Sequence, residues 1–496
     1  MSTDNTYAFS SGRKSGRRCW LGAGVLLLVL SLGVPLYQVW DPFFQERTLQ
    51  YEGLEEHFKY GSIGNEDQQG MPYWIWLVLP RVFADKLPGP GGYTALGVIW
   101  EEGQELPVGF SRKQARVPMV SPNCALCHTS SYRRSEMDGK PVIVSAGAGQ
   151  RFDAQGYLRF LFECASDPRF SADVLLPELE KLHSFSWAQK QLYRFVVIPK
   201  TREALLKQKQ HFSWMDTRPA WGPGRVDPLN PAKFGFLRMP DDATIGTSEV
   251  PPLWGMQARP EGVHHWDGLN PLLRESVLSA AIETGSSPKA INRQEVEESL
   301  KKVQGFLLES KVPIYPFELV QERVKTGAAI YAAHCASCHG AQGQGTSQII
   351  PIAEVSTDSH RWISWSEEAA RRYNDYTLSQ VWRLRSFRKT SGYLAVPLTG
   401  LWLRAPYLHN GSVPSLMDLL EPPAKRPRRF YRGNDVYDPA RVGFVSDKPS
   451  VRRAGGTYTF FPYDTSVPGN GNGGHLHGVD LPPDSKLALL EFLKTL

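Results

Sequence analysis

The chain has 496 residues, of which 41% are hydrophobic and 21% are charged, and its formal net charge is +6 at pH 7. This length favours more than one domain, and the composition is that of a globular protein rather than a disordered one. The basic residues form no concentrated stripe, which argues against a nucleic-acid partner.

An apolar run is the first element in chain order. Residues 19–40 contain no charged side chain, and four basic residues lie between positions 13 and 18. At about 1.5 Å per helical residue the run spans roughly 33 Å, enough for a bilayer core. A basic flank belongs on the cytoplasmic side, and no small-residue cleavage site follows the run. We therefore expect a cytoplasmic tail (1–18) and a transmembrane signal anchor (19–40). A buried soluble helix is the alternative.

Two C-x-x-C-H motifs carry the strongest chemical signal. They consist of Cys124, Cys127 and His128, and of Cys335, Cys338 and His339. This spacing is the attachment signature of c-type haem, in which two thiols bond the porphyrin vinyl groups and the histidine ligates the iron. A thioredoxin-like pair would need a βαβ setting, and a zinc site would need paired knuckles or further histidines. We predict two covalently bound haem c groups, with His128 and His339 as iron ligands.

The second motif also predicts its own fold. Residues 316–333 have the pattern of a helix that runs into the motif, and residues 482–496 form a last helix with an apolar stripe. The arrangement resembles the first and last helices of class I cytochrome c, with Gly327 meeting the face of Leu489 and Phe492. The first motif lacks such a lead-in helix, so we expect its domain to be a diverged version.

The expected architecture is mainly α, with two cytochrome-c-like haem domains and long loops, preceded by one N-terminal transmembrane helix. A charged helix over residues 295–308 places the domain break near 300–315. We predict an N-terminal haem domain at 41–310 and a C-terminal cytochrome c domain at 311–496. The N-terminal helix would attach the protein to the bacterial inner membrane, with the main body in the periplasm.

Several short motifs resemble the bacterial di-haem cytochrome c peroxidase family. The sequence His-Trp-Asp-Gly occupies 265–268, between the two haem motifs, and Ala-Pro-Tyr-Leu-His-Asn-Gly-Ser occupies 405–412. Together with the glycine-rich residues 469–475, these segments are most similar to the rubber-oxygenase-like branch of that family. The resemblance covers most of residues 50–496.

The resemblance implies roles for two residues. It places Trp266 between the two haems, where an indole can relay electrons, whereas a packed core tryptophan is the alternative. In the peroxidases the second haem has a methionine ligand, and that position here is Pro423. The rubber-oxygenase-like branch instead implies His475 as sixth ligand of the second iron. His477 is the second candidate, and a solvated loop histidine is the alternative.

The surroundings of the first haem depart from the peroxidase pattern. The displaceable histidine of the peroxidases is replaced by Ala243, and the catalytic glutamate by Ser286, although Glu283 lies three residues away. Both departures weaken ordinary peroxide cleavage and favour an open distal side that binds O₂ or another small ligand. We take Trp266, Glu283 and His265 as candidate catalytic residues. The alternatives are a solvated charge for Glu283 and local hydrogen bonding for His265.

These features predict a haem oxidoreductase, either peroxidase-like or dioxygenase-like, in which one haem transfers electrons and the other reacts with H₂O₂ or O₂. An electron-transfer cytochrome of a respiratory chain, without substrate chemistry, is the alternative. A haem-based sensor is disfavoured because no signalling domain is recognisable. The expected redox partner is a small cytochrome, a cupredoxin or a quinol-linked complex. The basic segment 425–432 could dock an acidic partner, but solvation or pairing with haem propionates would also explain it.

Overall fold

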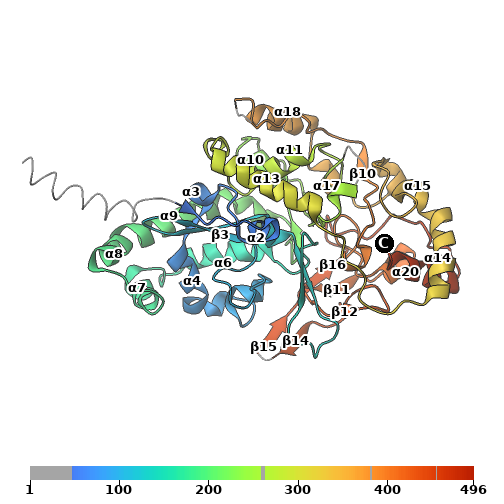
Figure 1. The fold of residues 1–496 in the computed structure, drawn as a ribbon, viewed down its shortest axis with the longest axis horizontal. Helices are drawn as coiled ribbons and strands as arrows, with labels where there is room; N and C mark the ends of the chain where they lie inside the picture. The colour runs from blue at the N-terminus through green and yellow to red at the C-terminus, as the bar shows by residue number, and fades with distance from the viewer. Residues whose placement is uncertain (1–46, 259–262, 380–381, 454) are drawn as a thin grey trace, which may run out of the picture. The chain divides into compact units, whose positions relative to one another are not determined.

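The computed structural model describes residues 47–258, 263–379, 382–453 and 455–496 (Figure 1). The chain divides into two units, of which the larger comprises residues 48–113 and 118–496 and contains both haem motifs. The smaller unit comprises residues 1–47 and 114–117. The boundary at residue 310 between two haem domains stays a prediction.

Helices occur throughout the larger unit. Up to the second haem motif they are α2 (Leu54–Tyr60), α3 (Glu66–Gln69), α4 (Tyr73–Val82), α5 (Cys124–Cys127), α6 (Ala154–Ser166), α7 (Ala172–Glu180), α8 (Trp187–Leu192), α9 (Ile198–His211), α10 (Asn230–Phe234), α11 (Leu273–Glu283), α12 (Pro288–Ile291), α13 (Gln294–Glu309) and α14 (Gln321–His334). From that motif onward they are α15 (Ala336–His339), α16 (Ile352–Val355), α17 (His360–Ile363), α18 (Glu367–Tyr376), α19 (Leu416–Leu419) and α20 (Pro483–Leu493).

The strands are short and pair in antiparallel fashion. They are β1 (Arg47–Thr48), β2 (Met71–Pro72), β3 (Phe110–Gln114), β4 (Met119–Pro122), β5 (Thr129–Tyr132), β6 (Val142–Ser145), β7 (Arg225–Val226), β8 (Ser248–Glu249), β9 (Ile349–Pro351), β10 (Gly392–Leu394), β11 (Arg429–Arg432), β12 (Tyr437–Asp438), β13 (Gly443–Phe444), β14 (Ser450–Arg453), β15 (Gly456–Thr459) and β16 (Phe461–Asp464). β4 pairs with both β2 and β3, and β11 pairs with β16. Further antiparallel pairs are β5–β6, β7–β8, β9–β10, β12–β13 and β14–β15.

The expected fold class, mainly α with long loops, is wrong. Of the described residues 41% are helical, and short antiparallel strand pairs lie in segments that were expected to form loops. Glycine directly follows α2, α3, α10 and α15, and the 44 glycines and 38 prolines of the chain disfavour long helices. Within the described residues no helix is both long and apolar enough to cross a membrane. The predicted transmembrane segment, residues 19–40, lies outside the described residues.

The pairing of the first and last helices of the second haem region is confirmed. α14 and α20 lie side by side (Figure 1), and their closest approach is at Gly327. A Cβ atom there would lie 2.0 Å from the carbonyl oxygen of Ala488 and 2.8 Å from Cβ of Phe492. The helix begins at Gln321, five residues later than expected from 316, and the backbone N–H of Val320 donates to Glu491 of α20 at 3.1 Å.

An aromatic core supports the region around the first haem motif. Trp76 of α4 stacks on Tyr93 with ring centroids 4.4 Å apart, and its indole N–H donates to the hydroxyl of Tyr157 of α6 at 2.9 Å. Phe110 of β3 packs against the same indole at 4.9 Å. All four side chains are buried. This core fixes β3, whose partner strand β4 leads directly into the motif.

Candidate functional site

The first haem motif lies on a single helical turn between two strands. β4 ends at Pro122, α5 contains both cysteines, and β5 begins one residue after His128. Asn123 caps this turn, because its side-chain oxygen accepts from the backbone N–H of Ala125 at 3.0 Å. Its amide also donates to the carbonyl of Gly61 at 2.9 Å, which ties the turn to the end of α2. The expectation that this motif lacks a lead-in helix is confirmed.

The imidazole of His128 is prepared for metal ligation. Its Nδ1 lies 2.9 Å from the carbonyl oxygen of Pro251. Because a carbonyl oxygen only accepts, Nδ1 carries the proton and Nε2 is left with a lone pair. Burial lowers the pKa of His128 to about 4, so the ring stays neutral as a ligand must be. Cys124 and Cys127 are free thiols beside it.

The second haem motif follows the end of α14 and has the same histidine arrangement. Nδ1 of His339 lies 2.9 Å from the carbonyl oxygen of Val396, and burial lowers the pKa of the ring. The hydroxyl of Tyr331 donates to the carbonyl of Gly340 at 2.9 Å and holds the turn closed. Each motif thus offers two free thiols and a neutral imidazole, which is the donor set that haem c requires.

The glycine-rich loop 469–475 brings His475 opposite His339. The two ring centroids are 6.3 Å apart, with planes inclined by 46°. Two imidazoles on opposite sides of one metal ion, with metal–nitrogen bonds of about 2 Å, have centroids roughly 6 to 6.5 Å apart. Nδ1 of His475 is buried without a hydrogen-bond partner, and burial lowers the pKa of the ring to about 3. His477 is exposed, so the separation and the burial both favour His475.

The loop that carries His475 is joined to another predicted motif. The amide of Asn410, in the segment 405–412, donates to the carbonyls of Gly469 at 3.2 Å and Gly471 at 2.9 Å. The backbone N–H of His475 donates to Val355 at 3.0 Å, and its φ is +48°, in the left-handed region that few non-glycine residues adopt. The structure thus brings together two motifs that are separate in sequence.

Trp266 lies between the backbone segments that hold the two proximal histidines. Its indole N–H donates to the carbonyl of Glu249 at 2.7 Å, two residues before Pro251, the partner of His128. Its own carbonyl accepts from the backbone N–H of Leu394 at 2.8 Å, two residues before the partner of His339. The side chain is partly buried. A path of backbone bonds and hydrogen bonds therefore connects the two haem motifs through this residue. It enters at the indole N–H and leaves at the backbone carbonyl.

Glu283 and His265 are joined through an aromatic cluster. The Glu283 carboxylate accepts from the hydroxyls of Tyr373 at 2.9 Å and Ser279 at 3.0 Å, and burial raises its pKa to about 7. Phe387 packs against Tyr373 at 4.7 Å and against the His265 ring at 5.7 Å. Nε2 of His265 is buried without a hydrogen-bond partner. Glu283 is thus no solvated charge, and Tyr373, which the sequence analysis missed, positions it.

The two positions that correspond to peroxidase catalytic residues have structural contacts. Ala243 is exposed, and its backbone N–H donates to Asp241 at 2.9 Å. Ser286 is buried, and its hydroxyl donates to the carbonyl of Ile63 at 2.7 Å. Neither side chain supplies an acid or a base to a distal pocket.

Sequence analysis also missed two buried ion pairs close to Trp266. Arg432 donates to both carboxylate oxygens of Glu249, at 2.8 and 2.7 Å, and Arg361 donates to Asp267 at 3.1 Å. All four side chains are at most 3% exposed. The position of Arg432 within a basic segment was the available signal, but nothing in the sequence pointed to Glu249 as its partner.

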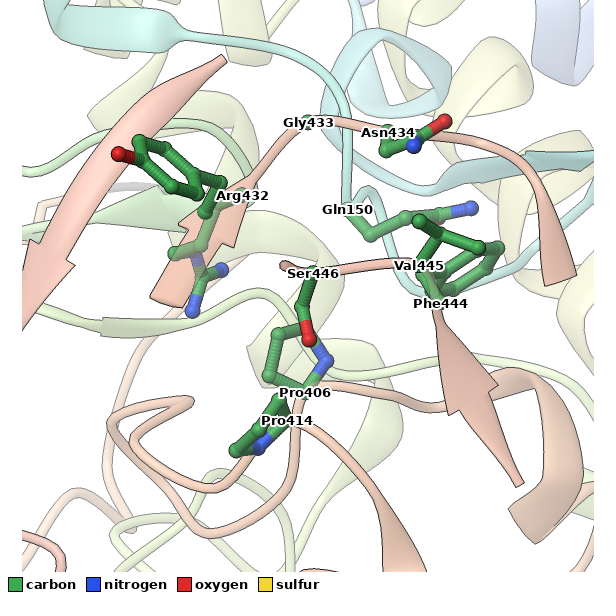
Figure 2. A pocket seen from close by; sticks show the side chains of 10 residues that line it. Gln150, Pro406, Pro414, Arg432, Gly433, Asn434, Phe444, Val445 and Ser446 are labelled. Atoms are coloured by element: carbon green, nitrogen blue, oxygen red, sulfur yellow. The ribbon is translucent and has the colours of Figure 1, made fainter. Parts of the chain in front are cut away.

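A small pocket lies beside Arg432 (Figure 2). Gln150 and Asn434 also line it, and each has one buried amide atom without a hydrogen-bond partner. None of the predicted haem residues lines this pocket, so we assign it no ligand.

Comparison with known proteins identifies the second haem region. A family model for cytochrome c matches residues 324–396, and a model described as RoxA-like, cytochrome c-like matches residues 392–431. The chain is 26% identical over 518 residues to the uncharacterized protein y4iJ of Sinorhizobium fredii, a match that covers 81% of this chain and 83% of that protein. It is 29% identical over 281 residues to the uncharacterized protein y4iM of the same organism, covering 51% of this chain and 62% of that protein.

Proposed function

On the premise that this is a c-type cytochrome of the RoxA-like kind with covalently bound haem c, we propose that the chain carries two haems and acts as a periplasmic haem oxidoreductase. Its cytochrome c domains indicate a haem c electron-transfer protein located outside the cytoplasm. The proposal adds a second haem at Cys124 and Cys127, where the thiols and His128 repeat the donor set of the matched region.

The haem at Cys335 and Cys338 is the electron-transfer site in this proposal. His339 and His475 would hold its iron, and the separation of their rings supports this assignment. Iron with two strong protein ligands exchanges electrons but offers no position to a substrate. The exposed basic residues Lys425 and Arg428 would dock an acidic donor such as a small cytochrome, a cupredoxin or a quinol-linked complex.

The single observation that carries the proposal is the position of Trp266. One hydrogen bond joins it to the segment that holds His128, and another joins it to the segment that holds His339. An indole between two redox sites can relay electrons. The hydrogen bond of the indole N–H on one side and that of the Trp266 backbone carbonyl on the other support this role. Electrons from the donor would thus pass from the second haem to the first.

The first haem is the reactive site of the proposal. A haem bound there supplies iron that can transfer electrons to H₂O₂ or O₂. Glu283, with a pKa near 7, can hold a proton on its carboxyl oxygen and release it at neutral pH, while Tyr373 and Ser279 orient that oxygen. His265 offers an unpartnered imidazole nitrogen in the same aromatic cluster.

The test of the relay compares two tryptophans with the same hydrogen-bond geometry. Trp266 and Trp362 are both partly buried, and each indole donates to a backbone carbonyl at 2.7 Å. Half-reduced protein is mixed with H₂O₂ or O₂ in a stopped-flow instrument, and oxidation of the second haem is followed optically. Trp266→Phe should slow that oxidation by roughly tenfold, equivalent to about 1.4 kcal/mol of barrier, whereas Trp362→Phe should not. Equal rates in both variants would remove Trp266 from the electron path.

Two further measurements separate the proposal from a plain electron carrier. Intact mass spectrometry should show two haem adducts on the native polypeptide, and a single adduct would contradict the proposal. Cyanide or carbon monoxide should rapidly change the spectrum of one haem only, since at the other haem a protein ligand must first be displaced. If neither haem responds to these ligands or to peroxide, substrate chemistry is excluded and electron transfer alone remains.

A further inference from the structure

A buried arginine fastens the loop that carries His475. Arg426 is 4% exposed and makes five hydrogen bonds, all to backbone carbonyl oxygens. Three of these acceptors belong to the loop, namely Asn472 at 2.6 Å, Gly474 at 3.0 Å and His475 itself at 3.2 Å.

The other two acceptors fix the guanidinium to its surroundings. Nε of Arg426 donates to Glu421 at 2.9 Å, and Nη2 donates to Leu419 at the end of α19 at 3.2 Å. In the described part of the chain no carboxylate forms an ion pair with this side chain. Burial of an unpaired cation is unfavourable unless charge-assisted hydrogen bonds replace its hydration. Here the five carbonyl contacts provide them, so the position of the guanidinium defines the position of the loop.

We propose that Arg426 is the positioning residue that holds His475 in its orientation toward His339. From one side the guanidinium binds the carbonyls before and at His475, and from the other side Val355 accepts the backbone N–H of His475 at 3.0 Å. Both backbone groups of His475, its N–H and its carbonyl, are therefore hydrogen-bonded, and this fixes the direction of the imidazole. This inference rests on the proposed ligation of the second iron by His475.

The geometry requires arginine rather than another cation. Five N–H donors in one rigid plane reach five carbonyls, whereas a lysine ammonium has three donors at a single point. Arg426→Lys keeps the charge and most of the aliphatic stem but can satisfy only some of the acceptors. This substitution therefore separates the positioning effect from the charge.

The experiment uses haem-loaded, full-length protein and follows the second haem by electron paramagnetic resonance and optical spectra. Arg426→Lys and Arg426→Met should produce a high-spin fraction at the second haem. Both should also speed cyanide binding there by about tenfold or more, since lost hydrogen bonds raise the population of the open loop. Arg452→Met makes the same chemical change at an exposed position on β14, to which no role is assigned, and should leave both readouts unchanged. If Arg426→Met fails to fold, the lysine variant carries the test.

His475→Ala distinguishes the two ways in which the inference can fail. If this variant leaves the low-spin signal of the second haem unchanged, the proposed ligation is wrong and the inference fails with it. If His475→Ala removes the signal but both Arg426 variants keep the signal and the slow cyanide binding, the ligation stands and Arg426 is only structural. A lower melting temperature without a spectral change also counts against the positioning role.

Discussion

The two haem motifs of this chain share a chemistry and differ in how the fold supports them. The second follows a long helix, α14, which packs closely against the C-terminal helix α20 at Gly327. The first occupies one turn between strands β4 and β5, held by the side chain of Asn123. Close helix packing at Gly327 and the Tyr331 hydroxyl support the second motif, whereas the first has no such helix pair and is held by the contacts of Asn123. The local turn and the orientation of the histidine are therefore what the site requires, while the scaffold can vary.

The largest expected effect is at the helix crossing of the second motif. Gly327→Ala would place a methyl group 2.0 Å from the carbonyl oxygen of Ala488, so α20 must move away. We expect a loss of about 3 kcal/mol in the free energy of unfolding, measured by denaturant titration at the haem absorbance. Gly305→Ala on α13 is the matched control, since its new methyl group meets only Leu54, at 3.6 Å. It should be neutral or stabilise by up to about 1 kcal/mol. Equal effects would mean that close packing does not support this motif.

The second prediction concerns Glu283, the buried acid that we propose serves the first haem. Its pKa in the folded protein is raised to about 7 from the ordinary value of 4.5, chiefly by burial, against the opposing effects of Tyr373, Ser279 and Arg361. A raised pKa means that the folded state favours the protonated form. The stability that Glu283 contributes is therefore fully present below pH 4.5 and is lost as the pH rises through 7.

Glu283→Gln should remove this dependence. Between pH 4.5 and 7 the free energy of unfolding of the wild type should fall by about 3 kcal/mol relative to that of the variant. Denaturant unfolding at several pH values measures this difference. Turnover with H₂O₂ or O₂ should also fall above pH 7 in the wild type, since the proton donor is then ionised. Parallel stability curves for the two proteins would show that Glu283 is not protonated in the native state.

The smallest expected effect concerns the cap of the first motif. Asn123→Ala removes the acceptor for the backbone N–H of Ala125 and the donor to the carbonyl of Gly61. It should lower the free energy of unfolding by about 1–2 kcal/mol. Ser337→Ala changes an exposed polar residue inside the second motif and should stay within about 0.5 kcal/mol. Thermal or denaturant unfolding of the two variants would measure both changes. If the two substitutions have the same effect, side-chain contacts do not support the first motif.

Local patterns allowed the sequence to predict part of this structure. The spacing of the cysteines defines the attachment sites, and the glycine on one helix with the apolar stripe on another predicted the α14–α20 packing. The pairing of β11 with β16, by contrast, depends on residues about 30 positions apart, and no periodicity signals which strands will meet. The contact of Glu283 with Tyr373 spans 90 residues, and that of Arg432 with Glu249 spans 183.

The partners of the proximal histidines were also beyond prediction. Both acceptors are backbone carbonyls, at Pro251 and Val396, and every residue carries such a group. Only the folded chain shows which carbonyl is in reach. The same holds for the five acceptors of Arg426, which explains why a basic segment appeared to be solvated.

The hydrogen bonds of His128 and His339 to their carbonyls have equal length, so they would act alike on a haem bound at either motif. Each imidazole donates to a neutral carbonyl at 2.9 Å, so neither gains the extra basicity that a carboxylate partner would confer. His128 and His339 would then donate electron density to a bound iron to the same degree. In the two-haem proposal, a contrast in reactivity or midpoint potential would therefore come from other features, among them His475, which approaches His339.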